Sequence, residues 1–103
     1  MNAARKLFET RVTDIDGITI DTWKDTELVC LFYHGKEFAH FHGDTILDIR
    51  LSAKLIKAEG LARDVTKEIH PNRSPNSIWI GIAILNEDEV DHAIHLVKQA
   101  LNI

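Results

Sequence analysis

The stretch that decides the fold is residues 28–51, which read LVCLFYHGKEFAHFHGDTILDIRL. Short runs rich in aromatic and branched apolar residues alternate here with glycine-containing breaks, a pattern typical of strands joined by tight hairpins. We therefore predict strands over 28–33, 38–42 and 45–51. Gly35 suits the first central position of a type II′ turn, and Gly43-Asp44 offers a second turn of the same kind.

The flanking residues extend this unit into a sheet with helices. Residues 18–23 predict one more strand before it, which completes a four-stranded antiparallel meander. Residues 78–85, IWIGIAIL, are apolar on both faces and predict a fifth strand that is central or covered on both sides. Helices are expected over 3–11 and from Ser52 to about Gly60, where serine is a natural N-cap and glycine a natural C-terminal residue.

The last helix has the clearest signals. Asn86 at the N-cap and Glu89 three residues later have the form of a capping box. An apolar stripe then runs to the C-terminus through Val90, Ala93, Ile94, Val97 and Leu101. The sequence thus predicts an α+β fold in which an antiparallel meander of four strands and a fifth strand carry helices mainly on one face.

Composition narrows the class of protein. The 103 residues fit one domain, 1–103, and 45% of them are hydrophobic, enough for a single core. One cysteine, Cys30 in an apolar run, excludes a disulfide framework and is expected in the core. A net charge of −4 without a basic cluster argues against nucleic-acid binding. Without a signal-like segment or a long apolar run, we expect a cytoplasmic protein with no membrane partner.

The candidate site is centred on His40 and His42, which share one face of a strand because strand side chains alternate. Two-residue hairpin loops would place His40 opposite Leu31 and Leu47, and Asp48 on the other face. A shift of one residue would bring Asp48 to the histidines, and the spacing leaves both registers open. The other histidines outside this region, His34, His92 and His95, are expected at the surface.

Two kinds of site fit the histidine pair. Completed by Asp44 from the turn, or by His70 from the loop 70–77, the pair would support acid–base chemistry or would hold zinc or non-haem iron. Alternatively, the imidazoles only form hydrogen bonds at the sheet surface. No nucleotide-binding, serine-hydrolase or zincin motif is present, so the sequence itself names no cofactor.

A family resemblance rests on the order of four motifs. These are His40-Phe41-His42-Gly43-Asp44 with Asp48, the helix end Ala58-Glu59-Gly60, the loop Pro75-Asn76-Ser77-Ile78-Trp79, and a helix over 88–101. In this order they resemble the luciferase-domain family, small domains distantly related to fungal luciferases, over residues 34–101. The resemblance implies an α+β fold in which the loop 70–79 meets the histidine pair, so that His70, Ser77 and Trp79 contact a ligand.

The expected function is the binding of a small-molecule ligand or a partner chain at this histidine-rich surface. The alternative is an enzyme that uses His40, His42 and Asp44 for acid–base or metal-assisted chemistry on a small molecule. Because apolar residues occupy both faces of the predicted sheet, we also expect self-association as a homodimer.

Overall fold

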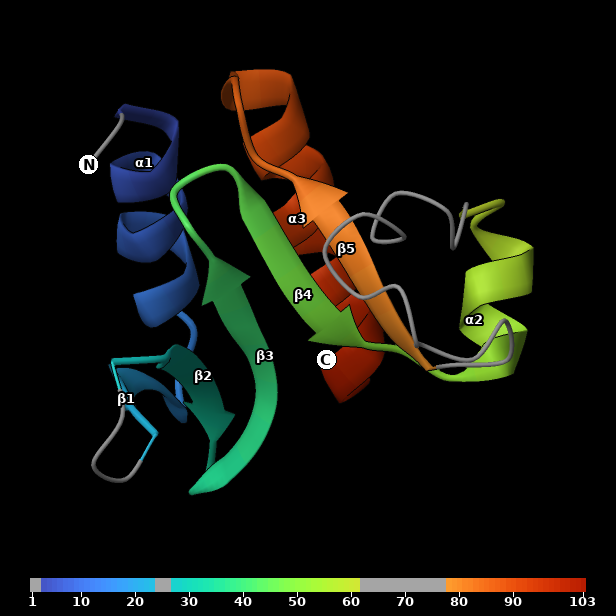
Figure 1. Ribbon diagram of the computed structural model, residues 1–103. Helices are drawn as coiled ribbons and strands as arrows, with labels where there is room; N and C mark the ends of the chain where they lie inside the picture. Colours follow the sequence, from blue (N-terminus) through green and yellow to red (C-terminus); the bar gives the residue numbers. More distant parts are fainter. Residues whose placement is uncertain (1–2, 24–26, 62–77) are drawn as a thin grey trace.

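Five antiparallel strands form one sheet in chain order, β1-β2-β3-β4-β5, in the computed structural model (Figure 1). The structure describes residues 3–23, 27–61 and 78–103. The strands are β1 (Ile18–Thr22), β2 (Val29–Tyr33), β3 (Lys36–His42), β4 (Ile46–Arg50) and β5 (Trp79–Ala83). The helices in these ranges are α1 (Ala3–Thr13), α2 (Ala53–Ala58) and α3 (Glu87–Leu101). The predicted α+β class and the four-stranded meander with a fifth strand are confirmed.

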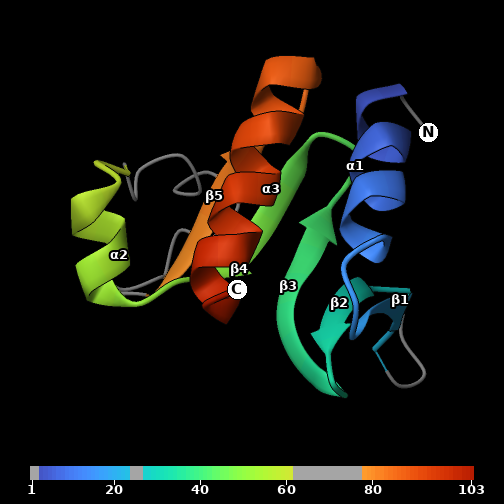
Figure 2. The same ribbon diagram turned by 180° about the vertical axis from the view of Figure 1, so that it is seen from behind.

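Helices α1 and α3 lie side by side on the same face of the sheet (Figure 2). Helix α1 buries Phe8 and Val12 against it, and the Phe8 ring meets the Phe41 ring edge-on at 5.9 Å between centroids. The α3 side chains buried there are Val90, Ala93, Leu96 and Val97. A fully buried valine, leucine or phenylalanine side chain contributes about 1.5–3 kcal/mol, and the residues that both helices bury here make this face the core.

The ends of the helices follow the local sequence. The Ser52 hydroxyl accepts a hydrogen bond from Leu55 N at 3.1 Å, and the Asn86 side chain accepts one from Glu89 N at 2.9 Å. Glu89 returns to the backbone one residue before the N-cap, where Oε1 accepts from Leu85 N at 2.8 Å. Both predicted N-caps are therefore confirmed, and Gly60 ends the α2 region with φ of +64°.

Two details of the predicted fold are wrong. Within the described ranges β5 is the last strand of the sheet and pairs only with β4, so of the two predicted alternatives, a central strand or one covered on both sides, the central position is wrong. On α3 the buried stripe includes Leu96, while Ile94 and Leu101 are only partly buried, because the helix faces α1 as well as the sheet. The predictions for residues 62–77 lie outside the described residues.

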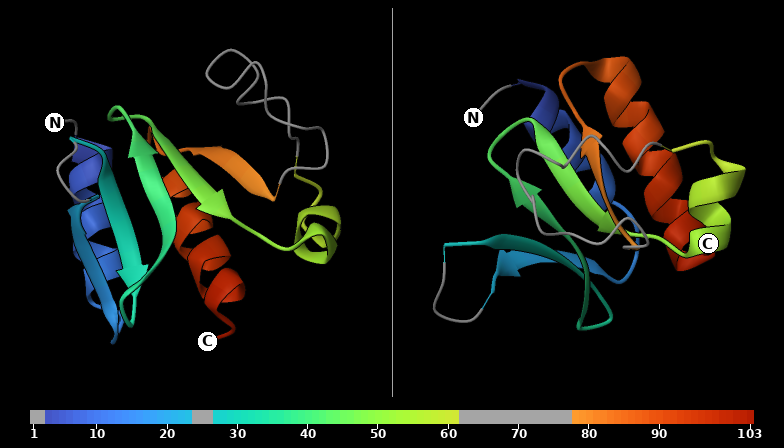
Figure 3. Two further views of the ribbon diagram at one scale, coloured as in Figure 1. Left: turned by 60° about the horizontal axis from the view of Figure 1, so that its bottom comes forward. Right: turned by 45° about the vertical axis from the view of Figure 1, so that its right-hand side comes forward.

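The second face of the sheet, away from α1 and α3, carries the histidines. Figure 3 shows both helices on the far side of the strands in its left-hand view, with α2 beyond the end of β4. The site is therefore built on strands rather than on the helical layer.

Among the described helices, none is long and apolar enough to cross a membrane.

Candidate functional site

The register between β3 and β4 decides which carboxylate meets the histidines. His40 lies opposite Asp48, and His42 lies opposite Ile46. The predicted register, with His40 opposite Leu47, is wrong by one residue because the connection has three residues, 43–45, rather than two. Gly43 takes a φ of +62° in this turn, a conformation that glycine adopts without strain. The shift brings Asp48 onto the same face as His40 and His42.

The hairpin between β2 and β3 also differs from the prediction. Tyr33 pairs with Lys36, so the two-residue loop is His34-Gly35, with φ of +49° and +84°. Positive φ at both loop residues is typical of a type I′ turn and not of the type II′ turn that we predicted. Together with a one-residue register shift between Leu31 and Phe32, this turn places Cys30, and not Leu31, opposite His40.

Three side chains converge on the second face. His40 Nε2 lies 3.0 Å from Asp48 Oδ2, and His42 Nε2 lies 3.9 Å from the same oxygen. One potential ligand atom from each residue falls within 4.8 Å of the other two. The side chain of Asp48 is fully buried, whereas those of His40 and His42 are 15% and 26% exposed. A buried carboxylate thus lies beneath two imidazoles that solvent or a ligand can reach.

Neighbouring residues enclose this cluster. The Trp79 ring lies 5.0 Å from the His40 ring between centroids, so the predicted aromatic neighbour is in place, although its contact with a ligand remains a prediction. On the other side, Glu37 Oε2 lies 3.6 Å from His40 Nδ1. Burial, and to a smaller extent the nearby Glu37 carboxylate, together raise the pKa of the Cys30 thiol to about 12. Cys30 is therefore a protonated core thiol.

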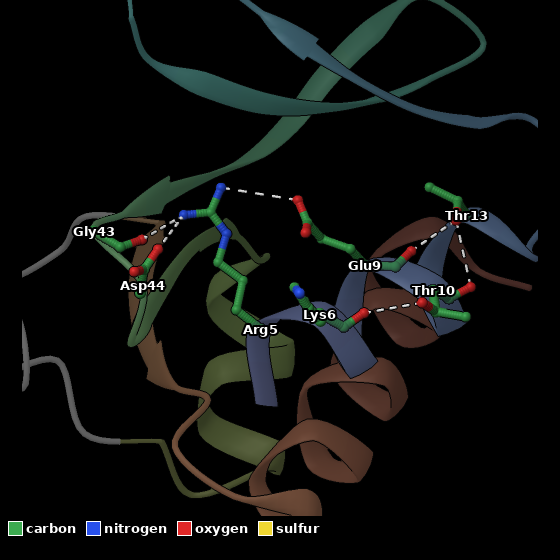
Figure 4. A network of polar contacts seen from close by, with 7 residues as sticks. All are labelled: Arg5, Lys6, Glu9, Thr10, Thr13, Gly43 and Asp44. Carbon is green, nitrogen blue, oxygen red and sulfur yellow. Dashed lines mark hydrogen bonds and ion pairs between the residues drawn. The ribbon is translucent and has the colours of Figure 1, made fainter. Parts of the chain in front are cut away.

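Asp44 has a different partner from the one we predicted. Arg5 Nη1 donates to Asp44 Oδ1 at 2.8 Å and to the Gly43 carbonyl at 3.0 Å, as Figure 4 shows. The same guanidinium lies 4.0 Å above the Phe41 ring. Asp44 thus joins the β3–β4 turn to α1, and the group of three potential ligands found among the described residues contains Asp48 in its place.

The remaining predicted residues are placed as follows. His92 and His95 are exposed on α3, as expected, and His95 Nε2 lies 2.9 Å from Glu59 Oε1. His70 and Ser77 lie outside the described residues. Asp48 is the residue that the predicted register missed, and the alternation of the strand identifies it once the turn is given three residues.

These features define an α+β domain with a histidine–carboxylate cluster on the sheet face opposite its helices. A family model described as Luciferase domain matches residues 35–100, which is more than half of the chain. The chain therefore belongs to the luciferase-domain family, as the order of its motifs indicated. No curated protein and no solved structure matches it.

Proposed function

We propose that this domain binds a divalent transition-metal ion through His40, His42 and Asp48, and that the bound ion acts on a small molecule. The observation that carries the proposal is the convergence of two imidazoles and one buried carboxylate within 4.8 Å. All three come from paired strands, which hold their side chains more rigidly than loops do. This replaces Asp44 with Asp48 in the site expected from the sequence.

The distances are close to those of a loaded centre. Two donor atoms bound tetrahedrally at about 2.0–2.1 Å lie about 3.3–3.4 Å apart. The His40–Asp48 and His42–Asp48 separations of 3.0 and 3.9 Å bracket this value. The separation of the two imidazoles is within 4.8 Å, so rotation of these partly exposed rings would have to bring their nitrogens closer while the buried carboxylate stays in place.

The donor set also selects the kind of ion. Imidazole nitrogen suits zinc, iron and copper, whereas calcium and magnesium prefer oxygen ligands throughout. Three protein ligands leave at least one coordination position open, which is typical of catalytic centres and not of structural ones. A bound ion at this position would polarise a ligand oxygen or lower the pKa of a bound water.

A second candidate is a metal-free acid–base site. His40 Nε2 and Asp48 Oδ2 are within hydrogen-bonding distance at 3.0 Å, and a buried carboxylate that orients an imidazole is the arrangement of a general base. In that case His40 would exchange protons with the substrate through its other nitrogen or after a movement of the ring. The two candidates differ in whether zinc binds.

The test is calorimetric titration of the purified chain with Zn²⁺, together with the visible absorption spectrum of the Co²⁺-loaded protein. We expect one equivalent to bind, and the His42→Ala and Asp48→Asn variants to lose at least about 100-fold in affinity. The matched control is His95→Ala, which removes an exposed imidazole that also contacts a carboxylate, and it should bind like the wild type. Absence of binding, or binding that the site variants leave unchanged, would reject the metal site.

The acid–base candidate has its own readout. Nitrogen-15 NMR of the metal-free protein should show His40 with its proton on Nε2, and the Asp48→Asn variant should change that signal while the His95 signal stays unchanged. A His40 ring that responds to neither Asp48→Asn nor Zn²⁺ would contradict both candidates.

A further inference from the structure

His40 has a carboxylate beside each of its ring nitrogens. Asp48 lies 3.0 Å from Nε2, and Glu37 lies 3.6 Å from Nδ1. Nδ1 is buried and has no hydrogen-bond partner among the residues that the structure describes. A neutral imidazole carries one proton and can donate from only one nitrogen at a time. The shorter contact, 3.0 Å at Nε2 against 3.6 Å at Nδ1, favours Nε2 as the nitrogen that donates to a carboxylate in the metal-free protein.

We propose that Glu37 is the positioning residue of the metal centre. Its carboxylate accepts a hydrogen bond from the Nδ1–H of His40 when Nε2 binds the ion; this inference rests on the proposed metal function. A nitrogen that binds a metal uses its lone pair, so the remaining ring N–H of a metal-bound His40 would be Nδ1–H, which faces Glu37. The lone pair of Nε2 and the released oxygen of Asp48 then both face the metal.

A bulge in β3 is what brings Glu37 to this nitrogen. In a regular strand, residues three apart such as Glu37 and His40 point to opposite faces. Here the pairing of β2 with β3 shifts between Leu31 and Phe32, so that Cys30 lies opposite His40 and Phe32 lies opposite Glu37. Phe38 is the extra residue and is 4% exposed in the core. Such bulges redirect side chains beside functional sites.

The position of Glu37 is itself constrained. Its side chain is 22% exposed and lies near the buried Cys30 thiol, whose Sγ contacts the Leu28 carbonyl at 3.9 Å. The carboxylate therefore lies between this thiol and Nδ1 of His40, and a closing movement of less than about 1 Å would give a normal hydrogen bond to Nδ1. Carboxylates in this outer position fix the tautomer and orientation of a metal-binding histidine.

Glu37 is not a fourth ligand of the same ion. The two nitrogens of an imidazole ring point in divergent directions, and Glu37 lies beside Nδ1 while the Asp48 oxygen that His42 also approaches lies beside Nε2. An ion held by Nε2 is therefore separated from Glu37 by the ring itself. The role left to Glu37 is to orient His40.

The test compares Glu37→Ala and Glu37→Gln with the wild type in Zn²⁺ affinity, in the Co²⁺ spectrum and in nitrogen-15 NMR of the imidazoles. We expect Glu37→Ala to lose about 10–100-fold in affinity, and Glu37→Gln to lose less because its amide oxygen can still accept the proton. In the wild type, the His40 proton should appear on Nε2 without metal and on Nδ1 with zinc. The control is Glu59→Gln, which changes the carboxylate beside His95 and should leave the Zn²⁺ affinity, the Co²⁺ spectrum and the His40 and His42 signals unaltered.

The possible outcomes separate this inference from the proposed function. If the wild type binds no zinc, both are overturned. If it binds zinc at His40, His42 and Asp48 but Glu37→Ala retains full affinity and an unchanged Co²⁺ spectrum, the metal function stands and the role of Glu37 is rejected. Retention of the proton on Nε2 in the zinc-loaded protein also rejects it. Circular dichroism identifies a variant that fails to fold, and Glu37→Gln, nearly equal in size, then carries the comparison.

Discussion

Two histidine–carboxylate contacts in this molecule have nearly the same length. His40 Nε2 lies 3.0 Å from Asp48, and His95 Nε2 lies 2.9 Å from Glu59. The first joins neighbouring strands and includes a fully buried carboxylate. The second joins the end of α2 to α3, where the histidine side chain is 49% exposed and the glutamate 27%. Distance alone therefore does not distinguish them.

The difference lies in solvent and in what surrounds each pair. A buried carboxylate has lost its water, so its partner must compensate for the lost hydration, and removing that partner is costly. An exposed pair exchanges its partner for water at little cost. The buried contact also has His42 within reach, whereas among the described residues no third potential ligand joins the exposed one. Burial of the carboxylate and a third potential metal ligand therefore distinguish the candidate site from the surface contact.

The largest test of this comparison replaces each histidine by alanine. We expect His40→Ala to lower the free energy of unfolding by about 3–5 kcal/mol, since it leaves a buried charge without its closest imidazole. His95→Ala should cost less than about 1 kcal/mol. Urea unfolding of both variants measures the difference, and equal losses would show that burial does not distinguish the two contacts.

The two arginines of α1 offer the same contrast with a smaller effect. Arg5 is 11% exposed, lies over the Phe41 ring and donates to the β3–β4 turn, whereas Arg11 is 36% exposed and pairs with Asp91 and Glu87. We expect Arg5→Ala to cost about 2 kcal/mol and Arg11→Ala about 0.5 kcal/mol. Thermal unfolding of the two variants would contradict this if Arg11→Ala were the more damaging.

The raised pKa of the buried Cys30 thiol predicts that the protein loses stability at alkaline pH. The folded thiol has a pKa of about 12, against an ordinary value of 9.0, so the folded state favours the neutral form. The stability that this preference contributes is present below pH 9 and is lost as pH rises toward 12. At pH 10 the loss is about 1.4 kcal/mol. Unfolding of the wild type and of Cys30→Ala at pH 8 and 10 measures it, and a parallel decline in both would oppose the prediction.

The smallest expected effect concerns salt. Glu59→Gln should change the free energy of unfolding by less than about 0.5 kcal/mol at low ionic strength, and by still less at 1 M salt, where the screening length is about 3 Å. The effect of His40→Ala should persist at that ionic strength because the Asp48 carboxylate is buried. Chemical unfolding by urea in low and high salt gives both values, and strong screening of the His40 effect would count against a buried site.

The sequence was sufficient for the elements and insufficient for the register. Alternation, the turn glycines and the caps at Ser52 and Asn86 are local signals, so they predicted the meander and the ends of the helices. The register depends on the number of residues in each turn, and Gly43-Asp44 is compatible with loops of two or three residues. That one residue decided whether Asp48 lay beside the histidines or behind them.

The bulge in β3 has a weaker signal in the sequence than the turns and helix caps have. Phe38 and Ala39 are consecutive apolar residues in a strand that otherwise alternates, and both lie in the core. A break in alternation of this kind indicates an added residue, and it would have placed Glu37 on the same face as His40. The burial of Asp48 had no such local signal, because it arises from the packing of several strands around one carboxylate.

The extra residue at Phe38 and the third residue of the 43–45 turn have a consequence for comparing members of this family. Both features determine which face of the sheet each later side chain occupies. They do so through the number of residues in the segment and not through the residue types. Substitutions between Lys36 and Ile46 at positions other than His40 and His42 can therefore leave the cluster assembled, but one inserted or deleted residue there would invert the side-chain order of the strand. In a family alignment, gaps in this segment would therefore distinguish two kinds of member. In one kind the three side chains share a face of the sheet, and in the other the same residue types are present but lie on different faces.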